Sequence, residues 1–447
     1  MTSSSIRNNA FIPEMVRSQK RGHPLGLYCI CSANRFVLEA AMLQANQDGT
    51  AVCIESTPNQ VNQSGGYSGK TPAEFVQFVH TVATDMGFPA ERIILGGDHL
   101  GPHVWQNETS ASAMLKAHEL VRQSILAGYT KIHLDTSMRC ADDPQGALNE
   151  EVMTERAADL CQTAEAAFSG RPAGSPPPYY VVGTEVPVPG GEQKAEASLS
   201  VTRTEDLERT LELTRKAFLQ RGLEAAWRRV IAIVVQAGVD FGDASIFAYD
   251  RDKARRLSLQ IEKQEGLVFE AHSTDYQTRQ ALKAMVEDHF AILKVGPWLT
   301  YAFREAIFAL AEIEQEWLAG RKGVVLSQIR ETLETAMLSN PIYWKNYYHG
   351  DETYVAYARK YSYSDRCRYY WLQPEVEAAL GRLRTNLSCN PPPLTLLSQY
   401  LPIQFEAIRQ GNALNSPEGL IRHKIQEVTS RYAYACGRRM NSVTDCQ

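Results

Sequence analysis

Short apolar runs alternate with amphipathic segments along the first two thirds of the chain. Eight such runs occur, and each is followed by a loop of Gly, Pro and polar residues and then by a segment with helical periodicity. Nearly continuous apolar strands are typical of a parallel sheet whose outer face is covered by helices. The runs are residues 26–32, 51–56, 93–97, 131–135, 179–184, 230–236, 267–272 and 290–295.

The segments between the runs carry helix-start and helix-stop signals. Residues 71–74 (TPAE) have the form of a capping box with proline at the first helical position, and the apolar stripe that follows ends near Gly87. Eight right-handed crossovers between parallel strands close a barrel, so we predict an α/β fold, a TIM (β/α)8 barrel over residues 1–310. A doubly wound open sheet is the alternative, but no dinucleotide-binding glycine motif follows an early run.

The alternation stops past residue 310. Helical patterns continue, for example over residues 325–337 and 375–387, and a helix breaker stands at 390–393 (NPPP). We predict that residues 311–447 form a C-terminal helical extension packed on the barrel. Segments 343–348 and 361–371 are dense in Tyr, Trp and Arg, which suits either this packing or contact with a partner protein.

The composition of the chain indicates which kinds of binding partner and which cellular location to expect. The 447 residues include 46 Lys+Arg and 51 Asp+Glu. The resulting net charge of −5 lacks the excess of basic residues that is typical of nucleic-acid-binding proteins. We recognise no signal peptide and no apolar stretch near the ~20 residues of a membrane span, so we expect no membrane partner. The nine cysteines include no CxxC pair, which favours buried free thiols and a cytoplasmic location. Whether the chain forms a homo-oligomer is left open.

Polar and ionisable side chains gather where the runs end. Such groups are costly to bury unless they are paired or bound to a cation, and the catalytic groups of TIM barrels come from these strand ends. Ion pairs at the barrel mouth are the alternative to a functional site. Seven runs supply the set: Glu55; Asp98 and His99; His133 and Asp135; Glu185; Gln236; Glu270, His272 and Asp275; and Lys294.

Spacing indicates which of these groups share a face. Residues two apart in a strand point to the same side, as His133 and Asp135 would. Asp98 and His99 are adjacent, and the glycines at 96–97 can break the pleat and let both reach the mouth. We predict a divalent cation, zinc above all, at this mouth. Its expected ligands are His99, Glu185 and His272, and the expected proton-transfer groups are Asp98, Asp135 and Glu55.

The loop after the eighth run has the features of an anion site. Lys294, Gly296 and Thr300 stand at the start of a predicted helix, whose N-terminus favours negative charge, and Ser273 adds a donor from the preceding loop. We expect a phosphate or sugar ligand here, with Gln236 as a further substrate contact; plain capping by Thr300 is the alternative. A Schiff base at Lys294 is also conceivable, but the nearby histidines favour metal chemistry.

Seven motifs are distributed over the chain, at residues 55–69, 96–105, 131–137, 183–191, 269–277, 293–299 and 361–371. Together they closely resemble the GatZ/KbaZ family, the large accessory subunits of D-tagatose-1,6-bisphosphate aldolase. The resemblance covers nearly the whole chain and implies a TIM barrel. It implies a subunit that supports the activity and stability of a zinc-dependent class II catalytic subunit in galactitol or N-acetylgalactosamine breakdown, through tagatose 6-phosphate. Older descriptions name such proteins tagatose 6-phosphate kinases, and some relatives look like metal-dependent ketohexose 4-epimerases.

The barrel also looks like a remote cousin of class II aldolases. Asp98 and His99 match their acid/base and zinc-ligand pair, and His272 matches a second zinc ligand. Where those enzymes carry a further zinc histidine, this chain has Gln236, which favours an accessory role. If Glu185 replaces the missing ligand, the alternative is a metal-dependent ketohexose or ketohexose-phosphate 4-epimerase or aldolase. A kinase finds no support, because no GxxxxGK[ST] loop is present.

Overall fold

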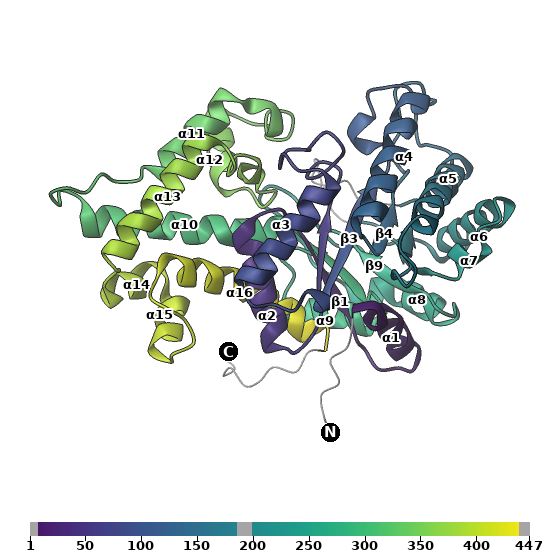
Figure 1. Ribbon diagram of the computed structural model, residues 1–447, viewed down its shortest axis with the longest axis horizontal. Coiled ribbons are helices and arrows are strands. Elements are labelled where there is room, and N and C mark those ends of the chain that lie inside the picture. Colours follow the sequence, from purple (N-terminus) through teal and green to yellow (C-terminus); the bar gives the residue numbers. More distant parts are fainter. Residues whose placement is uncertain (1–7, 186–198, 438–447) are drawn as a thin grey trace.

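Eight parallel strands close into a barrel. The computed structural model describes residues 8–185 and 199–437 (Figure 1). All eight predicted runs form strands, and the order β1-β10-β9-β6-β5-β4-β3-β2 closes on itself, which confirms the TIM barrel and excludes the open sheet. The strands are β1 (Leu27–Cys31), β2 (Val52–Ser56), β3 (Ile93–Leu100), β4 (Lys131–Leu134), β5 (Tyr179–Val182), β6 (Val230–Val234), β9 (Val268–Ala271) and β10 (Ile292–Val295).

Helices surround the barrel because their apolar stripes pack on the outer face of the strands. The predicted capping box is present in α3: the Glu74 carboxylate accepts the Thr71 main-chain N–H (2.8 Å). A small hairpin of β7 (Asp240–Phe241) and β8 (Ile246–Phe247) follows β6. The helices of this part are α2 (Arg35–Gln47), α3 (Pro72–Asp85), α4 (Ser110–Ala127), α5 (Glu150–Ser169), α6 (Thr204–Gln220), α7 (Glu224–Trp227), α8 (Arg251–Glu262), α9 (Arg279–Glu287) and α10 (Pro297–Leu318).

The helix α1 (Asn8–Lys20) covers the amino-terminal end of the barrel. Its apolar residues Phe11, Ile12 and Met15 pack with residues at the strand starts, such as Leu27 and Ala291. The carboxyl ends of the strands therefore form the only end left for a ligand, among the parts of the chain that the structure describes. Within the same ranges, no helix combines the length and the apolar character needed to cross a membrane.

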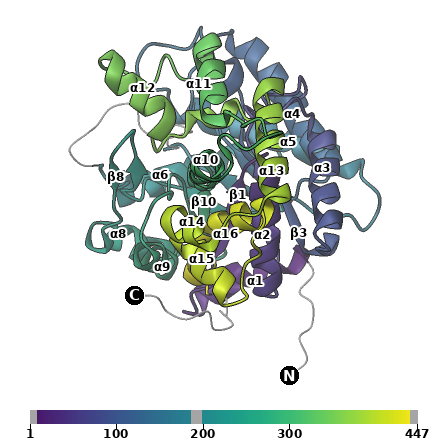
Figure 2. The ribbon, with the colours of Figure 1, turned by 90° about the vertical axis from the view of Figure 1, so that its left-hand side faces the viewer.

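A helical extension follows the barrel, as predicted. Its helices are arranged around α10, which runs outward from the barrel (Figures 1 and 2). They are α11 (Ile329–Ser339), α12 (Glu352–Tyr361), α13 (Pro374–Cys389), α14 (Leu394–Tyr400), α15 (Pro402–Arg409) and α16 (Pro417–Ala435). The division at residue 310 stays a prediction; α10 is one continuous helix across it.

The last helix returns to the barrel. Helix α16 packs against α2, α9 and α10, so it occupies the position between the first and the seventh outer helices. The carbonyl oxygen of Cys436, just past α16, accepts the main-chain N–H of Gly26 just before β1 (3.2 Å). The Tyr432 hydroxyl donates to the main-chain oxygen of Thr274 in the loop after β9 (2.9 Å). The extension is thereby fixed to the barrel at two places, the amino end of β1 and the loop that follows the carboxyl end of β9.

Candidate functional site

Three imidazoles converge at the carboxyl end of the barrel. They are His99 of β3, His133 of β4 and His272, which directly follows β9. Their ring centroids are 4.7 Å apart for His99 and His272, and 5.0 Å apart for each of the other two pairs. One ligand atom from each imidazole and one from Asp98 all lie within 4.8 Å of one another. The cluster therefore has enough ligand atoms, close enough together, to hold one metal ion.

An irregularity in β3 brings Asp98 and His99 to the same place. The pairing register between β3 and β4 shifts between Gly97 and Leu100, and His99 has a φ of +54°. A left-handed conformation is uncommon for a residue with a side chain, and such residues are enriched at functional sites. Both side chains are buried at the mouth, as the glycines at 96–97 predicted. Gly96 has a second role, because a Cβ there would lie 2.6 Å from Oε1 of Glu55.

A carboxylate holds one nitrogen of each imidazole. The three contacts are Nδ1 of His99 with Oδ2 of Asp135 (2.7 Å), Nδ1 of His133 with Oδ1 of Asp98 (3.0 Å), and Nε2 of His272 with Oε1 of Glu270 (3.1 Å). At His133 the carboxylate is nearer than the main-chain N–H of His99 (3.2 Å) and is charged, so it determines the tautomer. Metal-binding histidines have this arrangement: the proton-bearing nitrogen donates to a carboxylate and the other nitrogen keeps its lone pair.

Two of the remaining nitrogens have a spacing that suits a cation. Nε2 of His99 and Nδ1 of His272 lie 3.1 Å apart, close to the separation of two nitrogens that share a cation at ~2.0–2.1 Å. Nε2 of His133 is buried and has no hydrogen-bond partner in the described part of the chain. A buried nitrogen without a partner is costly, so His133 also has a lone pair free to bind a ligand.

Two lysines lie beneath the imidazoles among carboxylates. Lys131 is fully buried, with its Nζ 2.7 Å from Oε1 of Glu55 and 2.5 Å from Oε2 of Glu270. Lys294 forms ion pairs with Glu55 and, at 3.0 Å, with Oδ1 of Asp98. With neutral imidazoles the site has a net charge of −2, since four carboxylates (Glu55, Asp98, Asp135 and Glu270) face two ammonium groups. A divalent cation would balance this charge.

The pKa values of His99 and Asp98 also show that the excess of carboxylates in the site favours a positive charge. Burial disfavours an imidazolium at His99, but Asp98, Asp135 and Glu270 outweigh burial and raise its pKa to about 9. Burial also opposes ionisation of Asp98, yet His99, His272 and His133 hold its pKa well below the usual range. Asp98 therefore stays ionised at neutral pH.

The predicted anion donors are engaged by carboxylates of the chain. The main-chain N–H groups of Gly296 and Trp298, at the start of α10, donate to Oδ1 of Asp275 (3.0 and 2.8 Å). The Thr300 hydroxyl donates to Oδ2 of Asp365 (2.6 Å). Burial raises the pKa of Asp275 to about 6, although these N–H groups act in the opposite direction.

Replacing Asp275 by Asn tests this assignment. A raised carboxyl pKa means that the folded state holds the proton more tightly than the unfolded state, so stability falls as the pH rises from about 4 to about 6. Asn keeps an acceptor for both N–H groups and lacks the buried charge. Between pH 5 and 7.5 the free energy of unfolding of Asp275→Asn should rise relative to the wild type by about 1–2 kcal/mol.

The matched control is Asp351→Asn, since Asp351 accepts a main-chain N–H at the start of α12 (2.8 Å) but is exposed. Denaturant unfolding at the two pH values measures both differences. A difference between Asp275→Asn and the wild type that does not change with pH would contradict the buried charge at Asp275.

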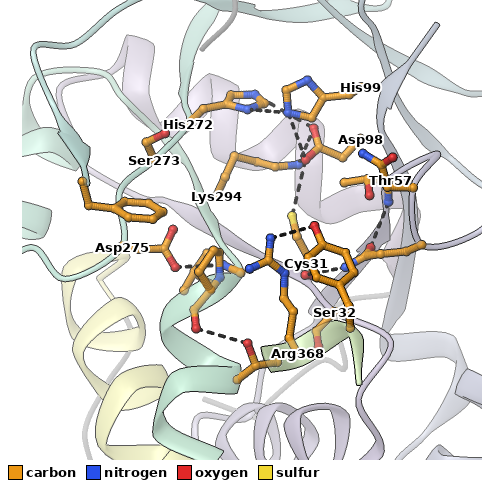
Figure 3. A pocket seen from close by; sticks show the side chains of 18 of the residues that line it. Cys31, Ser32, Thr57, Asp98, His99, His272, Ser273, Asp275, Lys294 and Arg368 are labelled. Carbon is orange, nitrogen blue, oxygen red and sulfur yellow. Dashed lines mark hydrogen bonds and ion pairs between the residues drawn. The ribbon is translucent and has the colours of Figure 1, made fainter. Parts of the chain in front are cut away.

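A pocket opens above the cluster (Figure 3). Its cavity has a volume of about 100 Å³ and is open to solvent on one side. Asp98, His99, His272 and Lys294 line it from the barrel, whereas Arg368 of the helical extension lines it from the opposite side. The pocket therefore lies between the histidine and aspartate side chains of the cluster on one side and a guanidinium group on the other. Its other lining residues include Cys31, Ser32, Thr57, Tyr67, Ser273, Asp275, Gly296, Thr300 and Tyr369.

Seven of the eleven predicted site residues line this pocket, two more lie in the cluster beneath it, and two lie elsewhere. Glu185 lies three residues past β5, is exposed, and accepts a hydrogen bond from the Thr202 hydroxyl. It lines a second, open depression together with Gln236. Glu55 and Asp135 belong to the cluster without lining the pocket; they contact Lys131 and His99 respectively.

Four residues of the cluster and the pocket have no role in the sequence-based prediction. The sequence places His133 and Glu270 at strand ends without a function, and it does not mark Lys131 or Arg368 as site residues. For Lys131 the signal is present in the sequence, because residues 131 and 133 are two apart in β4 and therefore point to the same face of the strand. For Arg368 there was no such signal, because only the folded extension brings it to the barrel.

Comparison with known proteins identifies the family of the chain. Residues 12–437 match the family described as D-tagatose-1,6-bisphosphate aldolase subunit GatZ/KbaZ-like. The chain belongs to this GatZ/KbaZ-like family. Its role is accordingly related to tagatose-bisphosphate aldolase, and the resemblance noted in the sequence is confirmed. Of the motif at 183–191, residues 186–191 lie outside the described residues.

Solved structures resemble this GatZ/KbaZ-like chain to different degrees. A probable tagatose 6 phosphate kinase from Sinorhizobium meliloti 1021 is 42% identical, with a TM-score of 0.83, over 92% of this chain and 100% of that chain. The YdjI aldolase from Escherichia coli K12 is 10% identical (TM-score 0.40; 69% and 86% of the chains). Fructose-bisphosphate aldolase from Campylobacter jejuni is 13% identical (TM-score 0.47; 86% and 93%). The last two similarities are too low to inform the function.

Proposed function

We propose that the barrel mouth is a metal-dependent site that makes and breaks the C3–C4 bond of a ketohexose or its phosphate. The supporting observation is that one nitrogen of each of three imidazoles lies within hydrogen-bond distance of a carboxylate, and that one ligand atom from each imidazole and from Asp98 lie within 4.8 Å of one another. His99, His133 and His272 would hold the ion. Three nitrogens and an open position suit zinc. When bound, such an ion supplies Lewis-acid polarisation of a ketose carbonyl or hydroxyl.

Asp98 is the carboxylate that faces the substrate. It lines the pocket and is ionised at neutral pH, so it can accept a proton. In this proposal Asp98 takes the proton of the C4 hydroxyl, the C3–C4 bond breaks, and its electron pair stays on the C2–C3 part of the ketose. Lys294, 3.0 Å from Asp98, adds positive charge beside the reacting atoms. Re-formation of the bond on the other face of C4 gives 4-epimerisation, and release of the aldehyde gives aldol cleavage.

Turnover by the purified chain tests this proposal. The zinc-loaded protein should epimerise or cleave tagatose, fructose or one of their phosphates without any other protein. Zn²⁺, Mn²⁺ and Co²⁺ are the ions to compare. Failure to convert all of these sugars with every ion would contradict an activity of this chain alone.

The second candidate is an accessory role, which the family description supports because it names a subunit. In this case the chain would bind a class II catalytic subunit of tagatose-bisphosphate aldolase, in the breakdown of galactitol or N-acetylgalactosamine. Mixing the two proteins should raise the rate of aldol cleavage and lengthen the half-life of the catalytic subunit. An unchanged rate and half-life would contradict it. Kinase activity is not proposed, since the sequence has no GxxxxGK[ST] loop.

A further inference from the structure

The helical extension places one arginine in the pocket. Arg368 lies in the short turn η4 (Arg366–Tyr369), and Figure 3 shows its side chain directed toward the pocket from the side opposite His99 and His272. The side chain is held by its own turn: Nη1 donates to the main-chain oxygens of Ser364 and Asp365, the latter at 3.0 Å, and Nη2 donates to the Tyr369 hydroxyl (3.0 Å). A guanidinium fixed in this way is preorganised for binding.

The guanidinium of Arg368 has no ion-pair partner. Within residues 8–185 and 199–437, no carboxylate lies within ion-pair distance of it, and Asp365 acts on its charge only from farther away. Two arginines of the same region differ in this respect: Arg304 faces Asp365 (3.4 Å) and Arg359 faces Glu334 (2.5 Å). Arg368 is half-buried, and an anionic ligand would give its charge a close partner.

The surroundings of Arg368 suit a phosphate group. Hydroxyl groups of Ser32, Thr57 and Ser273 line the same pocket and can donate to phosphate oxygens. Asp275 also lines it, but the N–H groups of Gly296 and Trp298 offset its negative charge.

We infer that Arg368 binds the phosphate group of a phosphorylated ketose, so that the helical extension completes the substrate site of the barrel. The inference rests on the proposed function, because the imidazole cluster would take the carbonyl and hydroxyl end of the same molecule. It assigns the extension a role in substrate specificity: the preference for a phosphorylated over a free sugar. Arginine binds phosphate through two parallel N–H bonds, and such charge-assisted bonds are among the strongest hydrogen bonds in proteins.

Binding measurements with Arg368→Gln test the inference. Isothermal titration with tagatose 6-phosphate, tagatose and inorganic phosphate should show that the wild type binds the phosphorylated sugar at least tenfold more tightly than the free sugar. In Arg368→Gln the affinity for tagatose 6-phosphate should fall roughly tenfold to a hundredfold, whereas that for tagatose should stay unchanged. Arg366→Gln is the matched control, because Arg366 lies in the same turn but donates to the main-chain oxygen of Tyr343 (3.0 Å) and does not line the pocket.

A second measurement on the unaltered protein covers the case in which Arg368→Gln does not fold. Tagatose 6-phosphate, but not tagatose, should protect Arg368 from modification by phenylglyoxal, as read by peptide mass spectrometry. Equal affinity of the wild type for tagatose and its phosphate, unchanged binding by Arg368→Gln, or an unprotected Arg368 would each overturn the inference. Binding and protection do not require turnover, so an inactive protein that still discriminates between the two sugars would contradict the proposed function alone.

Discussion

Asp98→Asn is expected to reduce turnover of the ketohexose substrate by about 10²–10⁴-fold, the usual effect of removing a general base. Asn has the same shape and can accept the hydrogen bond from Nδ1 of His133, so the imidazole cluster should persist. It cannot take a proton from a substrate hydroxyl, and it removes the charge that faces Lys294 (3.0 Å). Steady-state kinetics of the zinc-loaded variant measure the loss, and the metal content shows whether the site is intact.

The matched control for this variant is Asp159→Asn. Asp159 also accepts a hydrogen bond from a histidine, Nε2 of His118 (3.0 Å), but this pair lies on the outer helices α4 and α5. Its replacement should leave turnover unchanged. If Asp98→Asn retained most of the wild-type rate while holding its metal ion, Asp98 would not be the proton acceptor.

Lys131→Met is expected to destabilise the protein by about 3–5 kcal/mol, the usual effect of removing one partner of a buried ion pair. Lys131 is fully buried between Glu55 and Glu270, and methionine fills a similar volume without a charge. The two carboxylates then keep only Lys294 as a cationic neighbour. The shift in the midpoint of urea unfolding measures this effect.

An exposed ion pair gives the comparison for Lys131→Met. Lys116 lies 2.5 Å from Glu108, with side chains 42% and 34% exposed, and Lys116→Met should change the free energy of unfolding by less than about 1 kcal/mol. Adding Glu55→Gln to Lys131→Met should recover part of the lost stability, because it removes one uncompensated charge. Similar midpoints for Lys131→Met and Lys116→Met would contradict a stabilising ion cluster beneath the imidazoles.

The barrel could be predicted from the sequence because its signals are local. Each strand is a short apolar run, and each neighbouring helix carries its own start and stop residues, such as the capping box at Thr71 and Glu74. Pattern alone could not give the end of β3, which runs to Leu100 through the irregularity at His99. Nor could it place α16 between α9 and α2, since that position depends on contacts between distant parts of the chain.

The candidate site was predictable in its chemistry and less so in its members. His99, His272 and Asp98 are at strand ends, where the fold itself determines their position. Glu185 was expected beside them, but it lies in the loop past β5, where the strand no longer controls the direction of the side chain. The structure brings His133 to the cluster instead. Arg368 reaches the pocket only because the extension folds back over the barrel.

Metal content and zinc titration test the central claim most directly. The purified wild type, stripped with a chelator and titrated with Zn²⁺, should bind one ion per chain. His133→Ala and His272→Ala should each weaken this binding by at least a hundredfold, because each removes a nitrogen from the cluster. His118→Ala, which alters a histidine of the outer helix α4, should bind as the wild type does. A wild type that binds no divalent ion, or cluster variants that bind it equally well, would contradict the account.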